Sequence, residues 1–199
     1  MEPLVIAEQG HFFTGLRTHT GPAGTSVAGT HVQYQSPPSV RDNLILVHGG
    51  DGAVGLLDRI GPSVLLTHSF GGAFGWFALS ERPHLVKALV AIETSGPPFM
   101  KHPVLGDFTY GLTAVPVSYG PGSGDAKLGG IPVAVVSSPC SGFEPSCHAT
   151  TDYLRECGAS VDELRLADLG LHGNGHAMML EKNNAEVAAV LTDWIVKHT

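Results

Sequence analysis

The chain has 199 residues, of which 43% are hydrophobic and 15% are charged, and its formal net charge is -7 at pH 7. This length and hydrophobic content exclude a disordered chain and predict a single domain over residues 1–199. Phosphate recognition needs clustered positive charge, and the 11 lysines and arginines are scattered, so we expect no nucleic-acid partner. The longest apolar runs are far shorter than the roughly 20 residues of a membrane helix, which predicts a soluble chain without a membrane partner.

The first 40 residues alternate between polar and apolar side chains and are rich in turns. Residues 10–13 and 30–35 carry this alternation, and a Gly-Pro-Ala-Gly turn at 21–24 separates them. The pattern predicts an antiparallel meander. It changes at Asn43, where the continuous apolar run 44–47 ends in glycines and predicts a strand buried on both faces of a parallel sheet.

Strand and helix patterns then alternate as far as the C-terminus, interrupted by a Pro- and Gly-rich excursion at 94–130 and a glycine-rich loop at 171–179. This order predicts an α/β fold with a mostly parallel central sheet, helices on both faces and the N-terminal meander beside them. Strands are expected at 63–66, 85–92, 131–136 and 164–168, and helices at 54–60, 71–80, 150–157 and 184–198.

The segment Thr67-His68-Ser69-Phe70-Gly71 lies directly after an apolar strand and directly before a helix of small residues. This is the place of a nucleophile elbow, in which a serine hydroxyl projects from a sharp strand-to-helix turn between small residues. Gly71 meets that requirement and Thr67 meets it in part. A serine in a turn is often structural, so the interpretation depends on finding partners for Ser69 elsewhere in the chain.

A serine hydroxyl needs a general base, because its own pKa is far above neutral pH. His176 is the candidate base because its loop follows the last predicted strand, and His172 in the same loop is the alternative. His68, adjacent to the serine, is expected to point the other way. Glu93, at the end of the strand after the elbow helix, is the candidate acid that orients the imidazole, and the next strand is followed only by Glu144.

Two backbone N–H groups must receive the oxyanion that forms during attack on an acyl carbon. The first candidate is the N–H of Phe70, directly after the nucleophile, and the glycines after His48 place the second candidate at Gly50. Dinucleotide binding is the alternative interpretation of residues 49–52. The G-x-G-x-x-G spacing of that motif is not reproduced, which makes this alternative weaker.

The three cysteines allow at most one internal disulfide. Cys140 and Cys147 are the candidate pair because a short loop is predicted between them, and three free thiols, including Cys157, are the equal alternative. Their spacing matches no paired-thiolate zinc site, so we expect no metal.

Together these segments resemble the α/β-hydrolase superfamily, and within it a bacterial esterase group with a Ser-Glu-His triad. The likeness extends to residues 10–13 and 31–34 and to the His-Gly-Asn-x-His motif at 172–176. The resemblance implies that Ser69 is the nucleophile, Glu93 the acid and His176 the base. It also implies a compact hydrolase fold that needs no metal and no organic cofactor.

One departure from the resembled group is the presence of Gly50 and Asp51 where adjacent cysteines are usual. The larger departure is the shortness of segment 51–63, which has room for one short helix where a further strand and its crossover are usual. We therefore predict a shortened sheet, a direct crossover between neighbouring strands and an open site without a cap domain. The short connection is compatible with a natural minimal hydrolase and with an engineered deletion.

The sequence thus predicts a serine hydrolase that cleaves small-molecule carboxylic esters through an acyl-enzyme. A catalytically impaired or non-catalytic binding protein on the same scaffold and an acyltransferase are the alternatives. Aromatic residues of segment 95–120 could line an acyl pocket or simply pack, and homodimerisation stays open. No basic leader precedes the apolar runs, and a secreted or periplasmic origin stays open for a chain whose leader has been removed.

Overall fold

The computed structural model describes residues 8–21, 24–36, 43–47, 52–120 and 128–199 of the chain. Its central sheet has five strands in the order β3-β4-β5-β8-β9, and every neighbouring pair is parallel. The predicted α/β class with a mostly parallel sheet is therefore confirmed. The strands are β3 (Asn43–Val47), β4 (Ser63–His68), β5 (Val86–Ile92), β8 (Val133–Ser137) and β9 (Val161–Arg165).

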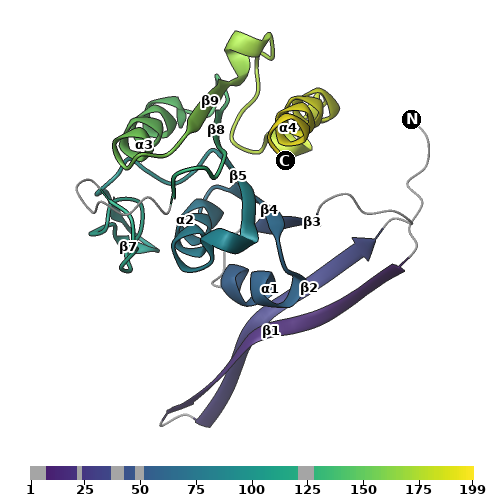
Figure 1. Cartoon of the computed structure of the whole chain (residues 1–199), viewed down its shortest axis with the longest axis vertical. Helices are drawn as coiled ribbons and strands as arrows, with labels where there is room; N and C mark the ends of the chain where they lie inside the picture. Colours follow the sequence, from purple (N-terminus) through teal and green to yellow (C-terminus); the bar gives the residue numbers. More distant parts are fainter. Residues whose placement is uncertain (1–7, 22–23, 37–42, 48–51, 121–127) are drawn as a thin grey trace.

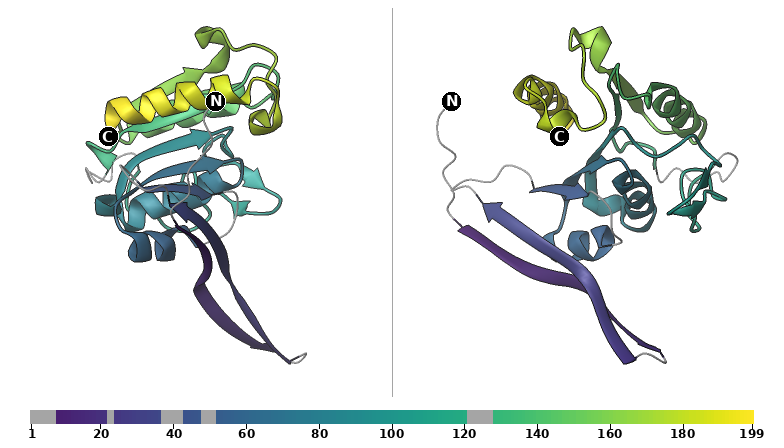
Figure 2. Two further views of the ribbon diagram at one scale, coloured as in Figure 1. Left: turned by 90° about the vertical axis from the view of Figure 1, so that its right-hand side faces the viewer. Right: turned by 180° about the vertical axis from the view of Figure 1, so that it is seen from behind.

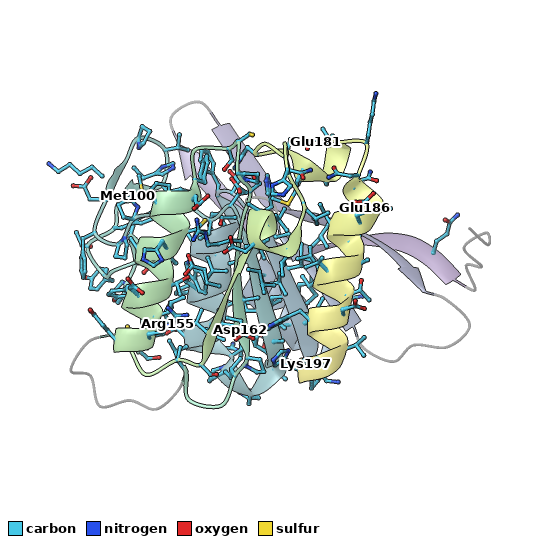
Figure 3. The ribbon with its side chains drawn as sticks, turned by 90° about the horizontal axis from the view of Figure 1, so that it is seen from above. Met100, Arg155, Asp162, Glu181, Glu186 and Lys197 are labelled. Atoms are coloured by element: carbon cyan, nitrogen blue, oxygen red, sulfur yellow. The ribbon has the colours of Figure 1, made fainter. Side chains whose placement is uncertain are left out.

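Helices cover both faces of the sheet, as predicted, but unequally (Figure 1). Three of them pack on one face, namely α1 (Ala53–Ile60), α2 (Gly71–Glu81) and α3 (Glu144–Glu156). The C-terminal helix α4 (Asn184–His198), whose bounds match the sequence prediction, packs on the other face. Figure 3 shows α3 and α4 on opposite sides of the sheet, with Asp162 of β9 between them. The Trp194 indole N–H on α4 donates to the Asp162 carboxylate at 2.7 Å and fastens the helix there.

Alternation along the strands divides the apolar side chains into two cores. On β4, Leu65 joins the core under α1, α2 and α3, and its neighbour Val64 joins the core under α4. Helix α2 approaches β4 closely, since a Cβ on Gly75 would lie 2.7 Å from the Thr67 methyl group. The small residues of α2 therefore have a packing reason.

The N-terminal segment forms a separate two-stranded antiparallel sheet of β1 (Glu8–Gly21) and β2 (Gly24–Ser36), which confirms the predicted antiparallel opening. This hairpin projects away from the helices and the central sheet (Figure 2). A second small hairpin, β6 (Lys101–His102) with β7 (Gly106–Asp107), lies within the Pro- and Gly-rich excursion.

The prediction for β3 is right about the strand and wrong about its burial. Ile45 is 3% exposed against the α1 side, but Leu44 is 54% exposed and Leu46 is 70% exposed. Strand β3 pairs directly with β4, as the short segment 51–63 predicts, and the crossover between them contains α1. That helix covers the α2 side of the sheet, and among the described residues nothing covers Leu44 and Leu46 on the α4 side.

Two boundaries also differ from the sequence prediction. Helix α3 begins at Glu144 rather than at residue 150, with Pro145 in its first turn, where the missing N–H of proline has no cost. Strand β9 begins at Val161, and the expected end of that strand forms the 3-10 helix η3 (Leu166–Leu169).

The candidate disulfide is wrong, and all three thiols are free. The reason is the early start of α3. Cys147 lies on that helix, buried, with its thiol 3.8 Å from the Val136 carbonyl oxygen, whereas Cys140 is exposed in the preceding loop. Burial raises the pKa of the Cys147 thiol to about 12. Among the described residues, no helix is long and apolar enough to span a membrane, and no cluster of three metal-binding side chains occurs.

Candidate active site

Ser69 lies at the turn between β4 and α2 with a φ of 56°, the left-handed backbone expected at a nucleophile elbow. The Ser69 N–H donates to the Ile92 carbonyl oxygen at 3.0 Å, which ties the turn to β5. A Cβ on Gly72 would lie 1.9 Å from the Thr94 hydroxyl oxygen, so glycine is required at this position in the first turn of α2. These contacts fix the direction in which the Ser69 hydroxyl projects.

The loop after η3 brings His176 to Ser69. The Ser69 hydroxyl lies 3.0 Å from His176 Nε2, a distance suited to proton transfer. His172, the alternative base, is exposed four residues earlier. The geometry therefore pairs Ser69 with His176 rather than with His172.

Glu93 follows β5 with a φ of 48° and is fully buried. Its Oε2 lies 3.4 Å from His176 Nδ1, and its Oε1 accepts from the Ser138 N–H at 2.6 Å and the Ser138 hydroxyl at 2.8 Å. A buried carboxylate needs such donors, because an unpaired charge away from water is strongly unfavourable. Glu144, the other carboxylate considered, is part of α3 and pairs with Arg165. Ser138 is a site residue that the sequence interpretation missed.

Two aromatic rings flank the His176 imidazole. Phe143 stacks on it with ring centroids 4.4 Å apart, and the His68 ring lies 4.6 Å away on a tilted plane. His68 Nε2 also lies 2.8 Å from the His176 carbonyl oxygen, to which its N–H donates. The expectation that His68 points away is therefore wrong. Period-two alternation along β4 places His68 on the same side as Leu66, the α4 side, where the His176 loop passes.

A polar cluster around the buried Asn174 anchors the His176 loop. The Asn174 side-chain amide donates to Glu181 Oε2 at 2.6 Å and to Asn183 Oδ1 at 2.7 Å, and the Gly175 N–H donates to Glu181 Oε1 at 2.8 Å. Asn174 is fully buried, and Glu181 lies beside the start of α4 (Figure 3). The sequence gives no direct sign of this cluster, because its members are brought together by the path of the loop.

Of the two candidate oxyanion donors, Phe70 belongs to the described residues and Gly50 does not. Phe70 directly precedes α2, so its N–H lies at the positive end of that helix, next to the Ser69 side chain. The Phe70 ring packs edge-on against His102 with centroids 4.7 Å apart. Gly50, with His48, Gly49 and Asp51, lies outside the described residues.

An apolar groove with a volume of about 770 Å³ opens beside Ser69. Its lining combines strand residues such as Leu46, Leu66 and Ile92 with residues of the 3-10 helix η4 (Met178–Leu180) and of α4. No residue of 95–120 lines it, although that segment was considered for an acyl pocket. Tyr119 of this segment packs elsewhere. It is buried, and its hydroxyl donates to the Trp76 carbonyl oxygen at 3.2 Å.

Comparison with models of known protein families finds no match. Over 174 residues the chain is 36% identical to a probable secreted lipase, phiG, of Fungal sp. (strain ATCC 74256). That match covers 71% of this chain and 48% of the relative, so the chain spans about half the length of the curated relative that it matches.

Solved structures of esterases share the architecture. A structure described as a novel bacterial esterase superposes with a TM-score of 0.72 at 18% identity, covering 100% of this chain and 98% of that one. The thermostable carboxylesterase EstE1, cloned from a metagenomic library, superposes with a TM-score of 0.62 at 14% identity, covering 98% and 90%. The chain therefore has the fold of the α/β-hydrolase esterases, as its sequence resemblance implies.

Proposed function

We propose that this protein is a serine hydrolase that cleaves carboxylic esters through an acyl-enzyme intermediate. The observation that carries the proposal is the relay Ser69–His176–Glu93, with 3.0 Å between the hydroxyl and the imidazole and 3.4 Å between the imidazole and the carboxylate. The esterase fold and the lipase relative support the same reaction class.

In the first half-reaction, Ser69 Oγ attacks the acyl carbon while His176 Nε2 accepts the hydroxyl proton. The Glu93 carboxylate accepts a hydrogen bond from the Nδ1–H of His176 and stabilises the imidazolium that forms. The Phe70 N–H, with that of Gly50, receives the negative charge on the former carbonyl oxygen. When the tetrahedral intermediate collapses, the C–O bond to the alcohol breaks and the leaving alkoxide takes the proton from His176 Nε2.

In the second half-reaction, His176 removes a proton from a water molecule that attacks the acyl-enzyme. The intermediate then collapses with Ser69 Oγ as the leaving group, and His176 returns the proton to it. The products are the free acid and the restored serine. Every proton passes through His176, so the contacts of Phe143, His68 and Asn174 that fix this loop are positioning contacts in the proposal.

The test is covalent labelling with a fluorophosphonate probe, followed by peptide mass spectrometry, together with hydrolysis of p-nitrophenyl acetate. We expect the label on Ser69 and loss of both labelling and hydrolysis in Ser69→Ala. Ser160→Ala is the matched control, because Ser160 is exposed and directly precedes β9, at the opposite end of the parallel sheet from Ser69, which follows β4. Undiminished hydrolysis in Ser69→Ala would remove the proposal.

We further propose that residues 1–199 act as one catalytic domain. The five-stranded sheet carries all three relay residues on its strand ends and the loop after η3, which supports this view. A single cooperative unfolding transition, seen alike by circular dichroism and tryptophan fluorescence, is the expected result. Two separate transitions would contradict it.

A further inference from the structure

We infer, on the basis of the ester-hydrolase function proposed above, that the groove between α4 and the open edge of the sheet holds the acyl chain. The geometry points to esters of aliphatic acids of about eight carbons or more as the substrate class. The chain would run from Ser69 along the α4 face of the sheet, rather than into the Pro- and Gly-rich excursion.

The groove is continuous with the reacting atoms. Ser69 and His176 are part of its lining, and beyond them the lining is apolar on both sides. Leu46, Leu66 and Ile92 form the sheet side, and residues of η4 and α4 form the other side. An acyl group attached to Ser69 Oγ therefore meets methyl and methylene groups as it leaves the relay.

The polar side chains of the lining are gathered at the mouth or already occupied. His68 and His176 lie beside Ser69, and the Asn184 side chain donates to the Met179 carbonyl oxygen at 3.1 Å. Among the described lining residues no charged side chain faces the groove. The hydroxyl or charged groups of a polar acyl chain would be desolvated in the groove without forming new hydrogen bonds, which is unfavourable. An aliphatic chain has no such polar groups to desolvate.

The groove is open because of the short crossover between β3 and β4. That crossover supplies α1 to the opposite face, so on this side α4 is the only α-helix of the described chain that covers the sheet (Figure 1). It leaves Leu46 70% exposed at the edge. The short crossover between β3 and β4 therefore leaves the apolar groove open.

The length of the groove sets the length of the chain. Leu66 lies on β4, three residues before Ser69, which directly follows the strand, and three residues span about 10 Å in a strand. With carbon–carbon bonds of about 1.5 Å in a zigzag, roughly eight carbons are needed to cover it. The volume of about 770 Å³ lies within the range of pockets that enclose whole ligands and greatly exceeds what an acetyl group needs.

The first experiment measures kcat/KM for p-nitrophenyl esters with acyl chains of two, four, six, eight and twelve carbons, below their aggregation limits. Each buried methylene contributes about 0.8 kcal/mol, so we expect kcat/KM to rise by up to about fourfold per carbon until about eight carbons. A flat profile for an enzyme whose acetate hydrolysis depends on Ser69 would overturn the acyl-groove proposal and leave the proposed function standing. Absence of both labelling and hydrolysis would instead overturn the proposed function.

The second experiment fills the groove from α4. Ala188 is exposed and lines the groove, whereas its neighbour Ala189 is also exposed and does not line it. We expect Ala188→Trp to lower the ratio of octanoate to acetate kcat/KM at least tenfold, and Ala189→Trp to leave it unchanged. An unaltered ratio in Ala188→Trp would show that the chain lies elsewhere.

A second copy of the chain is the other occupant that the groove could take. Light scattering of the native protein and of Ala188→Trp distinguishes it. A dimer that Ala188→Trp dissociates, combined with a flat chain-length profile, would assign the groove to self-association and overturn the proposal. A rising profile with an unchanged mass in both proteins supports it.

Discussion

The two faces of the central sheet differ in how completely they are covered. Helices α1, α2 and α3 close one face over a core that includes Trp76, Leu89 and Leu154, all fully buried. On the other face α4 packs over a core with side chains from β4, β5, β8 and β9, and the edge at Leu46 is left open beside Ser69. The comparison indicates that the closed face supplies most of the stability and the open face supplies the proposed chemistry.

The largest expected effect lies on the open face. His176→Ala removes the proposed general base, and we expect kcat/KM for ester hydrolysis to fall by at least about a thousandfold. The side chain is partly exposed, but its loss leaves the buried Glu93 Oε2 without the imidazole, so the free energy of unfolding should fall by about 1–3 kcal/mol. Activity assays and urea unfolding of the same preparation check both. His172→Ala should hydrolyse esters at the native rate, which would assign the role of general base to His176 rather than to His172. Loss of hydrolysis in His172→Ala with native hydrolysis in His176→Ala would contradict this assignment.

The next effect compares stability across the two faces. Trp76 is fully buried on the closed face, and Trp76→Ala should lower the free energy of unfolding by about 3–5 kcal/mol. Leu46→Ala, on the open face, removes a side chain that is already mostly in water and should cost less than about 0.5 kcal/mol. Chemical denaturation measures both. Equal losses in the two variants would show that the open face is covered in solution.

A third prediction concerns the free energy of unfolding at alkaline pH, which depends on two buried groups of the closed face. Burial raises the pKa of the Cys147 thiol to about 12 and holds the pKa of the Tyr119 hydroxyl well above its usual value. Because both groups are harder to ionise in the folded chain, their contribution is complete below pH 9 and is lost as the pH rises toward 12. For Cys147 alone the loss by pH 11 is roughly 3 kcal/mol.

Urea unfolding at pH 8 and pH 11 provides the measurement. Cys147→Ala should weaken the dependence on pH, while Cys140→Ala, which removes an exposed thiol, should leave it as it is. An identical slope in the native protein and in Cys147→Ala would count against burial as the cause.

The smallest expected effect concerns the support of the acid. Ser138→Ala removes the hydroxyl that donates to Glu93 Oε1 at 2.8 Å, but the Ser138 N–H still donates to the same oxygen. We expect kcat to fall about threefold to tenfold with little change in KM, because the substrate does not contact this residue in the proposal. Ser138→Thr keeps the hydroxyl and should restore most of kcat. A change in KM alone would point to a different role.

The relay could be predicted from the sequence because each member lies at a position defined by chain order. Ser69 follows a strand, Glu93 ends the next strand, and His176 occupies the loop before the last helix. Their supports could not be predicted, since Phe143 and Ser138 reach the relay through the packing of the loop between β8 and α3.

The prediction that β3 is buried on both faces failed for a different reason. An apolar run such as 44–47 indicates that a strand forms, but not whether a second helix covers its far side. That depends on the length of the next connection, which here contains only α1. The early start of α3 was missed in the same way, because a proline at its beginning reads equally well as a loop.

The left-handed backbone at Ser69 and Glu93 has a consequence for evolution and engineering. Non-glycine residues in this conformation are strained by about 1 kcal/mol or more each, and both occur where the proposed chemistry needs them. Selection for thermal stability alone would therefore favour glycine at these two positions. A screen that rewards only a higher melting temperature is expected to accumulate inactive proteins with an intact fold.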